Sequence, residues 1–432
     1  MKNYKLVLLI LSTFITNIVL AEEEEIIVTS SYIDSTLSTI ENPLHVVDGE
    51  DVTNGSTQSL GEIVDDLLGV ASSDFGYGVG QPVIRGMSGN RVKILSNGML
   101  IRDVSGLGPD HVNEIDLTNI QQIEIVRGPS SLLYSNGNIG GIINIVDNTI
   151  ARKDFEGAKV SVGLESQSVN DGDVYDFSYQ NNIGGINLSL SYKNSEFGEY
   201  DIPHGAVIHR EEEHHDEDED HDEDEHDEHD EHEEDMGYLA NSDFESESKK
   251  IGLSKTGDWG YFGMSSSKIE SAYGIPFHGE GHADHDEDAH EDEDHDEEGH
   301  DDHEGERIFA TTDSDVITLE GSYNLKGSLV NKIDYFYRDS DYMLQEQHAE
   351  EEGHEEEGHD DHHDEGPTVF SNEASEYGAI FHLTNDSVVQ KFVFNMADED
   401  ISIIGHEAFM NPTDNEENSF GYYLSSQRDN VH

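Results

Sequence analysis

Apolar and polar side chains alternate along the chain from about residue 155 onward. Ile186, Leu188 and Leu190, for example, are separated by Asn187 and Ser189. Successive side chains of a strand point to opposite faces, so this period of two predicts β-strands with one apolar and one polar face. In segments of about ten residues, the pattern is typical of a transmembrane β-barrel whose apolar face contacts lipid. Alternation alone leaves a soluble β-sandwich open as the other interpretation.

Ten segments have this pattern, and the connections between them alternate between short and long. We expect strands at 157–166, 173–182, 186–195, 249–256, 260–270, 316–325, 331–340, 375–384, 388–397 and 419–427. Short turns are expected at Gly184-Gly185, Asp258-Trp259, 326–330 and Asn385-Asp386. Every second connection of an up-and-down barrel emerges at the same rim, and outer-membrane barrels place short turns in the periplasm and long loops outside. The long connections are therefore expected to share the outer rim.

The segment from residue 22 to about 150 has a mixed pattern, which predicts an α/β domain. Ser59 and Glu62 have the spacing of a capping box, and the apolar periodicity after them predicts one short helix that ends at Gly69. The apolar positions of this helix are Leu60, Ile63, Val64, Leu67 and Leu68. Strand-like runs surround the helix, and Asn97-Gly98 is typical of a hairpin turn. The expected fold is thus an all-β transmembrane β-barrel preceded by an α/β domain.

The first 21 residues predict a secretory signal peptide. Lys2 and Lys5 precede an apolar run over 6–20, which ends in the small-residue pattern Val19-Leu20-Ala21. This run is shorter than the roughly 20 apolar residues that a membrane-spanning helix needs. The chain contains no cysteine, so disulfides and thiolate metal sites are excluded, and His, Asp and Glu remain as the strong metal ligands.

Histidine and acidic residues dominate three of the long connections, which we call the tracts: 204–235, 278–306 and 346–365. The tracts contain almost half of the chain's 96 Asp and Glu residues and 20 of its 25 histidines. The formal net charge of the chain is −74. This charge argues against nucleic acid as a partner, because affinity for DNA or RNA rests on basic groups that meet phosphates.

Imidazole together with carboxylate suits Zn²⁺, Cu²⁺ or Ni²⁺, whereas carboxylate alone suits Ca²⁺. The spacing of the histidines allows many interchangeable clusters of two or three ligands but no fixed tetrahedral site. We expect the tracts to collect metal ions through many weak sites and through their attractive field. The histidines expected to do so are His214, His215, His221, His226, His229, His232, His282, His285, His290, His295, His300, His303, His354, His359, His362 and His363. The alternative is a solvated, disordered acidic segment with incidental histidines.

Residues 81–147 resemble the plug domain of TonB-dependent outer-membrane receptors. The matching elements are Pro82, Ile84-Arg85-Gly86, Arg91, Leu95, Asn97-Gly98, 123–129 (IEIVRGP), Leu133-Tyr134 and 140–145 (GGIINI). The resemblance implies a globular plug inside a barrel of about 22 strands, a size that needs a plugged lumen. Ten strands are too few for such a barrel, and an open sheet would leave unpaired edges in lipid. We therefore expect the chain to be truncated at its C-terminus.

Residues 24–31, EEIIVTSS, resemble a TonB box, an extended segment that pairs by strand addition with the energising periplasmic protein. Its expected contact residues are Glu25, Ile26, Ile27, Val28 and Thr29. The alternative is an ordinary acidic terminus. The resemblance divides the chain into a signal peptide (1–21), a TonB-box segment and linker (22–40), the plug (41–152) and a partial barrel (153–432).

Within the family, the stretches GMSGNRVKILSNG and GPDHVNEID are similar to the zinc-uptake branch. The resemblance implies that Asp110 and His111 in the plug face the incoming metal. Residues 405–413, GHEAFMNPT, are similar to a barrel loop of the same branch and offer His406 and Glu407 as further ligands. His382 is expected to point into the lumen, with a structural role.

The resemblance implies a zinc importer in the outer membrane of a Gram-negative bacterium, in which the tracts collect metal and TonB opens the plug. It implies no enzymatic activity and no catalytic cofactor, since Zn²⁺ is the cargo. The expected partners are the TonB complex, a divalent metal ion and outer-membrane lipid, around a monomer. Two alternatives remain open: a receptor for haem or a metal chelate, and a surface metal buffer or adhesin that imports nothing.

Overall fold

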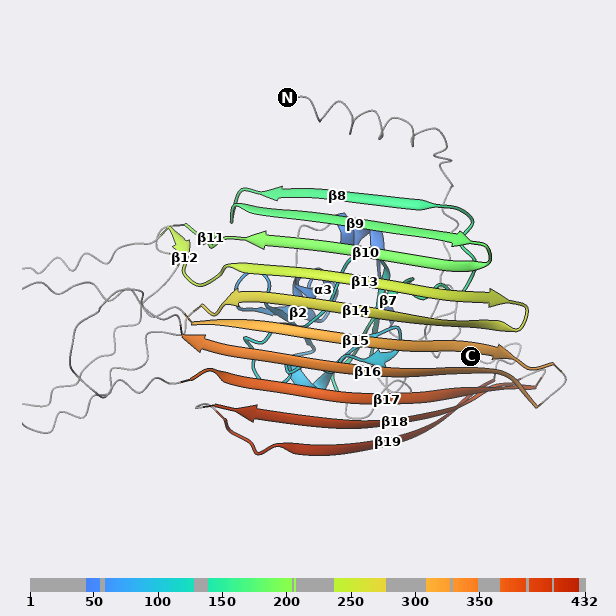
Figure 1. The fold of residues 1–432 in the computed structure, drawn as a ribbon. Coiled ribbons are helices and arrows are strands. Elements are labelled where there is room, and N and C mark those ends of the chain that lie inside the picture. Colours follow the sequence, from blue (N-terminus) through green and yellow to red (C-terminus); the bar gives the residue numbers. More distant parts are fainter. Residues whose placement is uncertain are drawn as a thin grey trace, which may run out of the picture. The chain divides into compact units, whose positions relative to one another are not determined.

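The computed structural model describes residues 44–54, 59–127, 139–203, 206, 237–276, 308–326, 329–348, 366–385, 388–405 and 408–426. These residues form an N-terminal α/β domain and a ten-stranded antiparallel sheet (Figure 1). The predicted signal peptide, the TonB-box segment, the sixteen tract histidines expected to collect metal, His406 and Glu407 lie outside the described residues. Within the described part of the chain, no helix is long and apolar enough to cross a membrane.

The N-terminal domain is built on a five-stranded sheet with the strand order β1-β6-β7-β4-β5, in which β4 and β7 pair in parallel. Its elements are β1 (Leu44–Asp48), α2 (Gly49–Asn54), α3 (Leu60–Val64), β2 (Val70–Asp74), β3 (Gly80–Ile84), η2 (Gly89–Arg91), β4 (Val92–Ser96), β5 (Met99–Leu100), β6 (Ile120–Val126) and β7 (Gly141–Asp147). Fully buried residues such as Val64, Ile84 and Ile123 form its core. The predicted α/β pattern is thus confirmed.

The predicted helix after Ser59 is correct at its start and wrong at its end. The Ser59 hydroxyl accepts a hydrogen bond from the Glu62 backbone N–H at 3.3 Å, as an N-cap does. Helix α3 ends at Val64, however, because the chain then turns through short-range bonds from Leu67 N to Val64 O and from Val70 N to Leu67 O. Leu68 consequently points to solvent, with 86% of its surface exposed. Helix α2 was not predicted from the sequence.

All ten predicted barrel strands are present in one sheet, and each pairs with its neighbour in antiparallel fashion. They are β8 (Lys159–Gln167), β9 (Gly172–Ile183), β10 (Ile186–Phe197), β13 (Phe244–Gly257), β14 (Gly260–Gly274), β15 (Ile308–Asn324), β16 (Val330–His348), β17 (Thr368–Asn385), β18 (Val388–Ile404) and β19 (Thr413–Ser426). Strands β11 (Tyr200–Asp201) and β12 (Tyr238–Leu239) form a separate ribbon. In the described part of the chain, β8 and β19 form the two edges of the ten-stranded sheet.

Several strands extend further toward the long connections than predicted. Strand β15 begins at Ile308 instead of 316, and β16 runs to His348 instead of 340. These two ends pair with each other, with Ile308 opposite His348. Hydrogen bonds between backbones do not depend on side-chain polarity, so pairing continues where the apolar and polar alternation is weak.

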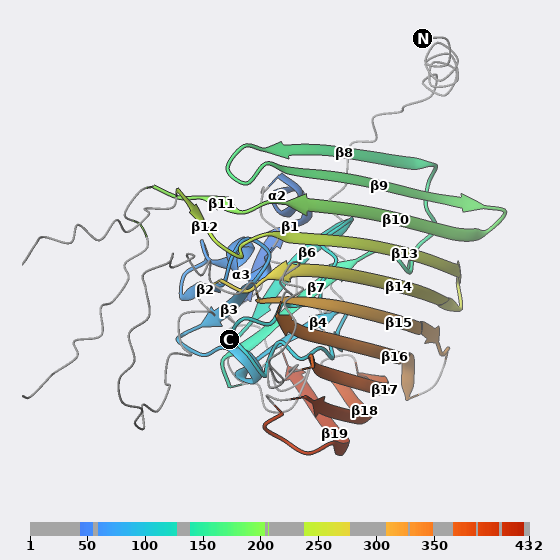
Figure 2. The ribbon, with the colours of Figure 1, turned by 60° about the vertical axis from the view of Figure 1, so that its left-hand side comes forward.

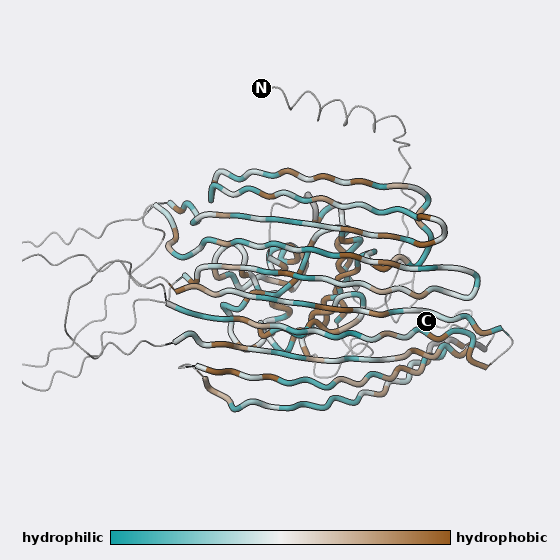
Figure 3. The backbone as a smooth tube through the Cα atoms, viewed as in Figure 1, coloured by the Kyte–Doolittle hydropathy of each residue, from teal (hydrophilic) through white to brown (hydrophobic). Residues whose placement is uncertain are grey.

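The two faces of the ten-stranded sheet differ in polarity, as the alternation predicts. Ile317 and Phe392 lie on one face and are 50% and 40% exposed, whereas Thr318, Glu320 and Lys391 on the other face are at most 5% exposed. Apolar and polar residues are interspersed along most of the strands in Figure 3. An apolar outer face with a polar inner face is the arrangement of a membrane barrel and is the inverse of a soluble sandwich.

The α/β domain packs against the polar face of the sheet (Figures 1 and 2). Ion pairs join the two parts: Lys250 Nζ lies 3.2 Å from Asp116 Oδ2, and Arg152 Nε lies 3.1 Å from Glu320 Oε1. The polar residues of the inner face therefore contact the plug-like domain, and this boundary is where the sequence-predicted Asp110 and His111 lie.

Candidate metal site

Three potential metal ligands meet at the boundary between the α/β domain and the sheet. Asp110 and His111 belong to the loop between β5 and β6, and Glu346 comes from β16. One ligand atom from each residue lies within 4.8 Å of the other two. The predicted Asp-His pair is thus joined by a carboxylate from the sheet. Three oxygen and nitrogen donors at this separation are arranged to share a single ion.

The ring of His111 is held in one orientation. Its Nδ1 atom lies 2.9 Å from the Val104 carbonyl oxygen, and its Nε2 atom lies 2.9 Å from Glu346 Oε1. The edge of the ring also packs on Phe370 at a centroid distance of 4.9 Å. Because a carbonyl can only accept a hydrogen bond, Nδ1 carries a proton, and Nε2 faces the two carboxylates. A histidine that binds metal through Nε2 is commonly oriented by such a bond from Nδ1 to a carbonyl.

The electrostatic environment of His111 favours a cation. Burial lowers the pKa of this imidazole, but the hydrogen bonds with Glu346 and Val104 and the negative charges of Glu346 and Asp110 outweigh burial, so the pKa lies above its ordinary value. A proton on Nε2 would be donated to Glu346 Oε1, which lies 2.9 Å away. A divalent ion at this position would displace that proton and satisfy the same carboxylates.

Gln81 holds the loop that carries Asp110 and His111. It lies in β3, is 5% exposed, and its Nε2 atom lies 2.7 Å from both the Ser105 and the Gly108 carbonyl oxygens and 3.1 Å from that of His111. The loop is thus tied at three points to a strand of the domain core. The sequence analysis did not identify Gln81 as part of the site, because nothing in the local pattern indicates which carbonyls the amide contacts.

Gly108 leaves the space that the ligand atoms occupy. A Cβ atom at this position would lie 2.7 Å from Asp110 Oδ1 and 3.0 Å from His111 Nε2, both closer than ordinary van der Waals contact. The absence of a side chain at residue 108 therefore allows the two ligands to approach each other. Its backbone conformation is ordinary for an L-residue, so the steric effect of a Cβ can be tested alone.

Gly108→Ala is expected to weaken the binding of a divalent metal ion at this site by about 10- to 100-fold, similar to the loss of an outer-shell partner of a metal ligand. The added methyl group would push Asp110 and His111 apart without removing either ligand. The effect is measured as the rate of uptake of the metal ion at a limiting concentration of that ion. Gly157→Ala is the control, because a Cβ at Gly157 meets no atom within 4 Å. Equal uptake by the two variants would show that the space at Gly108 is irrelevant to binding.

The structure shows that one predicted boundary is wrong. Residues 346–348, which the sequence pattern assigned to the metal-collecting tract 346–365, belong to β16. The structure places Glu346 within β16, opposite Thr368 and Ala310, with 12% of its side chain exposed. The strand continues because backbone pairing extends past the residues that alternate clearly. Only a weak pattern in the sequence could have assigned Glu346 to the strand: Tyr342, Leu344 and Glu346 continue the period of two on the inner face.

The other sequence-predicted histidine of the sheet lies elsewhere. His382 forms a contact of 2.6 Å between its Nε2 and Asp334 Oδ2 on the adjacent strand, and its side chain is 16% exposed. This pairing within the sheet agrees with the expected structural role. The proposed ligands His406 and Glu407 remain a prediction, since they lie outside the described residues.

Comparisons with known proteins agree with this architecture. Residues 36–142 match the family model of the TonB-dependent Receptor Plug Domain. The chain is similar to the solved structure of the copper transporter OprC, with a TM-score of 0.60 and 12% identity over 88% of this chain and 52% of OprC. It is also similar to the FrpB iron transporter from Neisseria meningitidis, with a TM-score of 0.56 and 11% identity over 85% of this chain and 50% of FrpB.

A third similar structure is the ferric enterobactin receptor PfeA, with a TM-score of 0.57 and 14% identity over 90% of this chain and 56% of PfeA. The chain thus spans about half the length of these solved structures. At such low identities, the likeness shows the fold and not the cargo. The chain carries a TonB-dependent receptor plug domain at residues 36–142 and shares the fold of the TonB-dependent receptors.

Proposed function

We propose that this protein is a TonB-dependent outer-membrane receptor that imports a divalent transition metal, zinc in the first place, into the periplasm. The observation that carries the proposal is the group of Asp110, His111 and Glu346 between the plug and the sheet. His111 is only 4% exposed. Asp110 and Glu346 are partly exposed, and one ligand atom from each of the three residues lies within 4.8 Å of the other two, close enough to bind one ion.

The dimensions of the group favour a bare ion over a large chelate. Zinc binds imidazole nitrogen and carboxylate oxygen at about 2.0–2.2 Å, so two ligands of a tetrahedral ion lie about 3.4 Å apart. His111 Nε2 and Glu346 Oε1 are 2.9 Å apart without metal. A small outward movement of Glu346 would make room for the ion. Affinity order alone favours Cu²⁺ at such a site, so the choice of zinc rests on the resemblance of Asp110-His111 and its surroundings to the zinc-uptake branch.

The strand topology supports a collecting role for the tracts. The part of the third tract that lies beyond β16, 349–365, begins directly after His348 and three residues after Glu346. In an antiparallel sheet the long connections that follow β10, β14 and β16 all emerge at one rim. Metal collected there would be close to the end of β16 that carries Glu346. TonB, bound to residues 24–31, would then supply the force that moves the plug.

The test is the zinc content of zinc-starved cells that express the gene, its variant without residues 24–31, or its variant without 211–235, 280–306 and 350–365. We expect the first deletion to abolish uptake. The second should leave uptake at saturating zinc nearly intact and slow it when zinc is scarce, because the tracts raise the local ion concentration. Metal accumulation that does not depend on 24–31 would identify a surface buffer. Uptake that requires added haem or chelator would identify a chelate receptor.

A further inference from the structure

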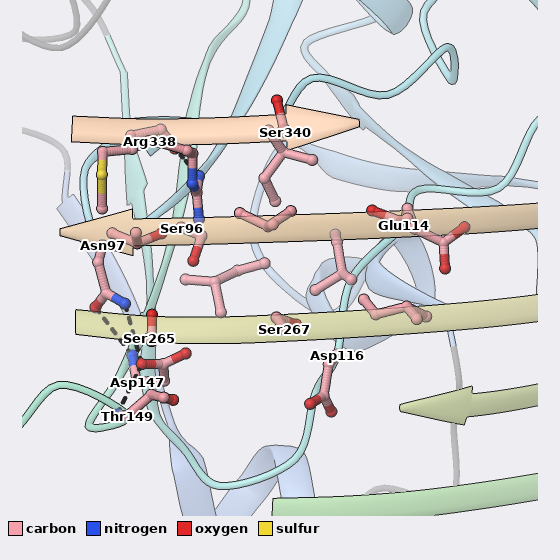
Figure 4. Close-up of a pocket in the computed structure, with 18 of the residues that line it drawn as sticks. Ser96, Asn97, Glu114, Asp116, Asp147, Thr149, Ser265, Ser267, Arg338 and Ser340 are labelled. Atoms are coloured by element: carbon pink, nitrogen blue, oxygen red, sulfur yellow. Dashed lines mark hydrogen bonds between the residues drawn. The ribbon is translucent and has the colours of Figure 1, made fainter. Parts of the chain in front are cut away.

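A chamber with polar and apolar walls lies between the plug and the sheet, separate from the Asp110–His111–Glu346 group. It has a volume of about 90 Å³ and is lined by the loop that contains Asp103 and Glu114 and by strands β14, β15 and β16 (Figure 4). The wall formed by the sheet is rich in hydroxyl groups, from Ser265, Ser267, Ser314, Thr318 and Ser340. This volume is large enough for several water molecules, or for an ion that keeps part of its hydration shell.

Glu114 presents an oxygen with no partner to this chamber. The residue is 6% exposed, and the Ser271 hydroxyl donates to its Oε1 atom at 3.2 Å. Among the described residues, its Oε2 atom and the neighbouring Thr312 hydroxyl both lack a hydrogen bond of normal geometry, and the same is true of the hydroxyl of Tyr342, which lines the chamber and is 1% exposed. A buried polar atom without a partner is unfavourable, and most such atoms in folded proteins are satisfied. Two unsatisfied oxygens on one chamber therefore indicate a missing ligand.

Negative charge accumulates around these two oxygens. Asp103 lines the same chamber, and its carboxylate accepts hydrogen bonds from the backbone N–H groups of Ser105 and Glu114, each at 3.1 Å. Burial raises the pKa of the Glu114 carboxyl to about 7, and the charge of Asp103 contributes to this increase. Both effects disfavour two unneutralised carboxylates, and a cation between them would remove the conflict.

Strand β16 connects the first site with this chamber. Alternate residues of a strand face the same side, so Glu346 at the first site and Tyr342, Ser340 and Arg338 at the chamber form one inward-facing row. At about 3.3 Å per residue, Tyr342 lies roughly 13 Å along the strand from Glu346. Glu346 is two residues from His348, the last residue of β16, whereas Tyr342 is six residues from it. The chamber is therefore further than the first site from the end of the sheet at which the tract follows β16.

We infer that Glu114, together with Asp103 and Tyr342, forms a second cation site, made of oxygen donors only, which receives the metal ion after it leaves His111. This inference rests on the proposed import function and adds the next position on the route. An all-oxygen site binds Zn²⁺ less tightly than one with imidazole and also accepts Mn²⁺. The ion would thus move from a tighter to a weaker site, which favours release toward the periplasm.

The basic residues that line the chamber, Arg102, Lys250 and Arg338, are already engaged. Arg102 is paired with Glu376, Glu399 and Glu417. Lys250 Nζ lies 3.2 Å from Asp116 Oδ2 and 3.5 Å from Asp147 Oδ2, and Arg338 donates to the backbone carbonyls of Met99 and Leu100 at 3.3 Å. Their positive charges therefore do not neutralise Glu114.

The test is anomalous diffraction from crystals of the full chain soaked with Mn²⁺ and, separately, with Zn²⁺. Wild-type crystals should contain Mn²⁺ between Glu114 and Tyr342. Glu114→Gln should weaken Mn²⁺ binding there at least about tenfold, as expected for a lost ligand, and should leave the zinc peak at His111 unchanged. That zinc peak also shows that the variant is folded. Glu320→Gln is the matched control, since Glu320 lines the same chamber but is paired with Arg152.

The two proposals fail in different ways in this experiment. A zinc peak at His111 without any Mn²⁺ or Zn²⁺ peak at Glu114 would overturn the second site and keep the first. A Mn²⁺ peak that persists in Glu114→Gln, or that disappears equally in Glu320→Gln, would also overturn the assignment of Glu114. Absence of zinc at His111 in wild-type crystals would instead contradict the proposed function itself.

Discussion

The double substitution Asp110→Ala with His111→Ala is expected to abolish high-affinity zinc uptake while the barrel still assembles. It removes the only nitrogen donor of the three-residue group and one of its two carboxylates, so the affinity of the site should fall by more than the roughly 10- to 100-fold that loss of an outer-shell partner causes. Both residues lie in a plug loop and contribute nothing to the outer face of the sheet. Radioactive zinc uptake at limiting metal measures the loss.

His382→Ala is the matched control for this prediction. Like His111, His382 pairs with a carboxylate, but its partner Asp334 belongs to the sheet and the pair lies outside the candidate site. Uptake should therefore be retained. If zinc uptake at limiting metal were unchanged in the double variant, the assignment of the site would be wrong, whatever the behaviour of His382→Ala.

Arg102→Ala is expected to destabilise the packing of the plug against the sheet by about 3 kcal/mol, the loss typical of removing one partner from a buried ion pair. The side chain of Arg102 is 5% exposed and lies near carboxylates on three strands: 3.8 Å from Glu376, 3.1 Å from Glu399 and 3.6 Å from Glu417. Glu376 is itself buried, so it would lose its nearest counter-charge and keep only the hydrogen bond from Asn395 and the charge of Arg338. Chemical unfolding followed by the fluorescence of Trp259 measures the change.

Lys268→Ala provides the comparison. Lys268 also lies near three carboxylates, those of Glu270, Asp313 and Asp315, but its side chain is 37% exposed. Water and salt screen such a cluster, so the substitution should change stability little. Similar losses of stability in the two variants would show that burial of Arg102 does not strengthen its interactions.

The fold could be predicted from the sequence because the two patterns that indicate it, alternation along strands and turn residues, involve neighbouring residues. Alternation between Ile186 and Leu190 reflects a strand with lipid on one side and a polar interior on the other, and the Asn97-Gly98 turn needs two residues that tolerate positive φ, which are observed at 53° and 85°. The helix end at Val64 was missed because turn bonds after it depend on how the chain enters β2.

The site could be predicted only in part, because its halves are far apart in the sequence. Asp110 and His111 are adjacent and could be recognised, whereas Glu346 contacts His111 across 235 residues. Which inward-facing residue of β16 meets the plug loop depends on strand register and on the position of the plug, neither of which leaves a local pattern. Gln81 and Glu114 escaped for the same reason: their roles follow from atoms that other segments bring to them.

The most direct test of the metal site is zinc-edge anomalous diffraction from crystals of the wild-type protein grown with one equivalent of zinc. The proposed function predicts a peak about 2.0–2.2 Å from His111 Nε2 and from a carboxylate oxygen of Glu346. The distance between His111 Nε2 and Glu346 Oε1 should then increase from 2.9 Å to about 3.4 Å. Zinc-saturated crystals in which these two atoms remain in direct hydrogen-bond contact, with no metal between them, would contradict it.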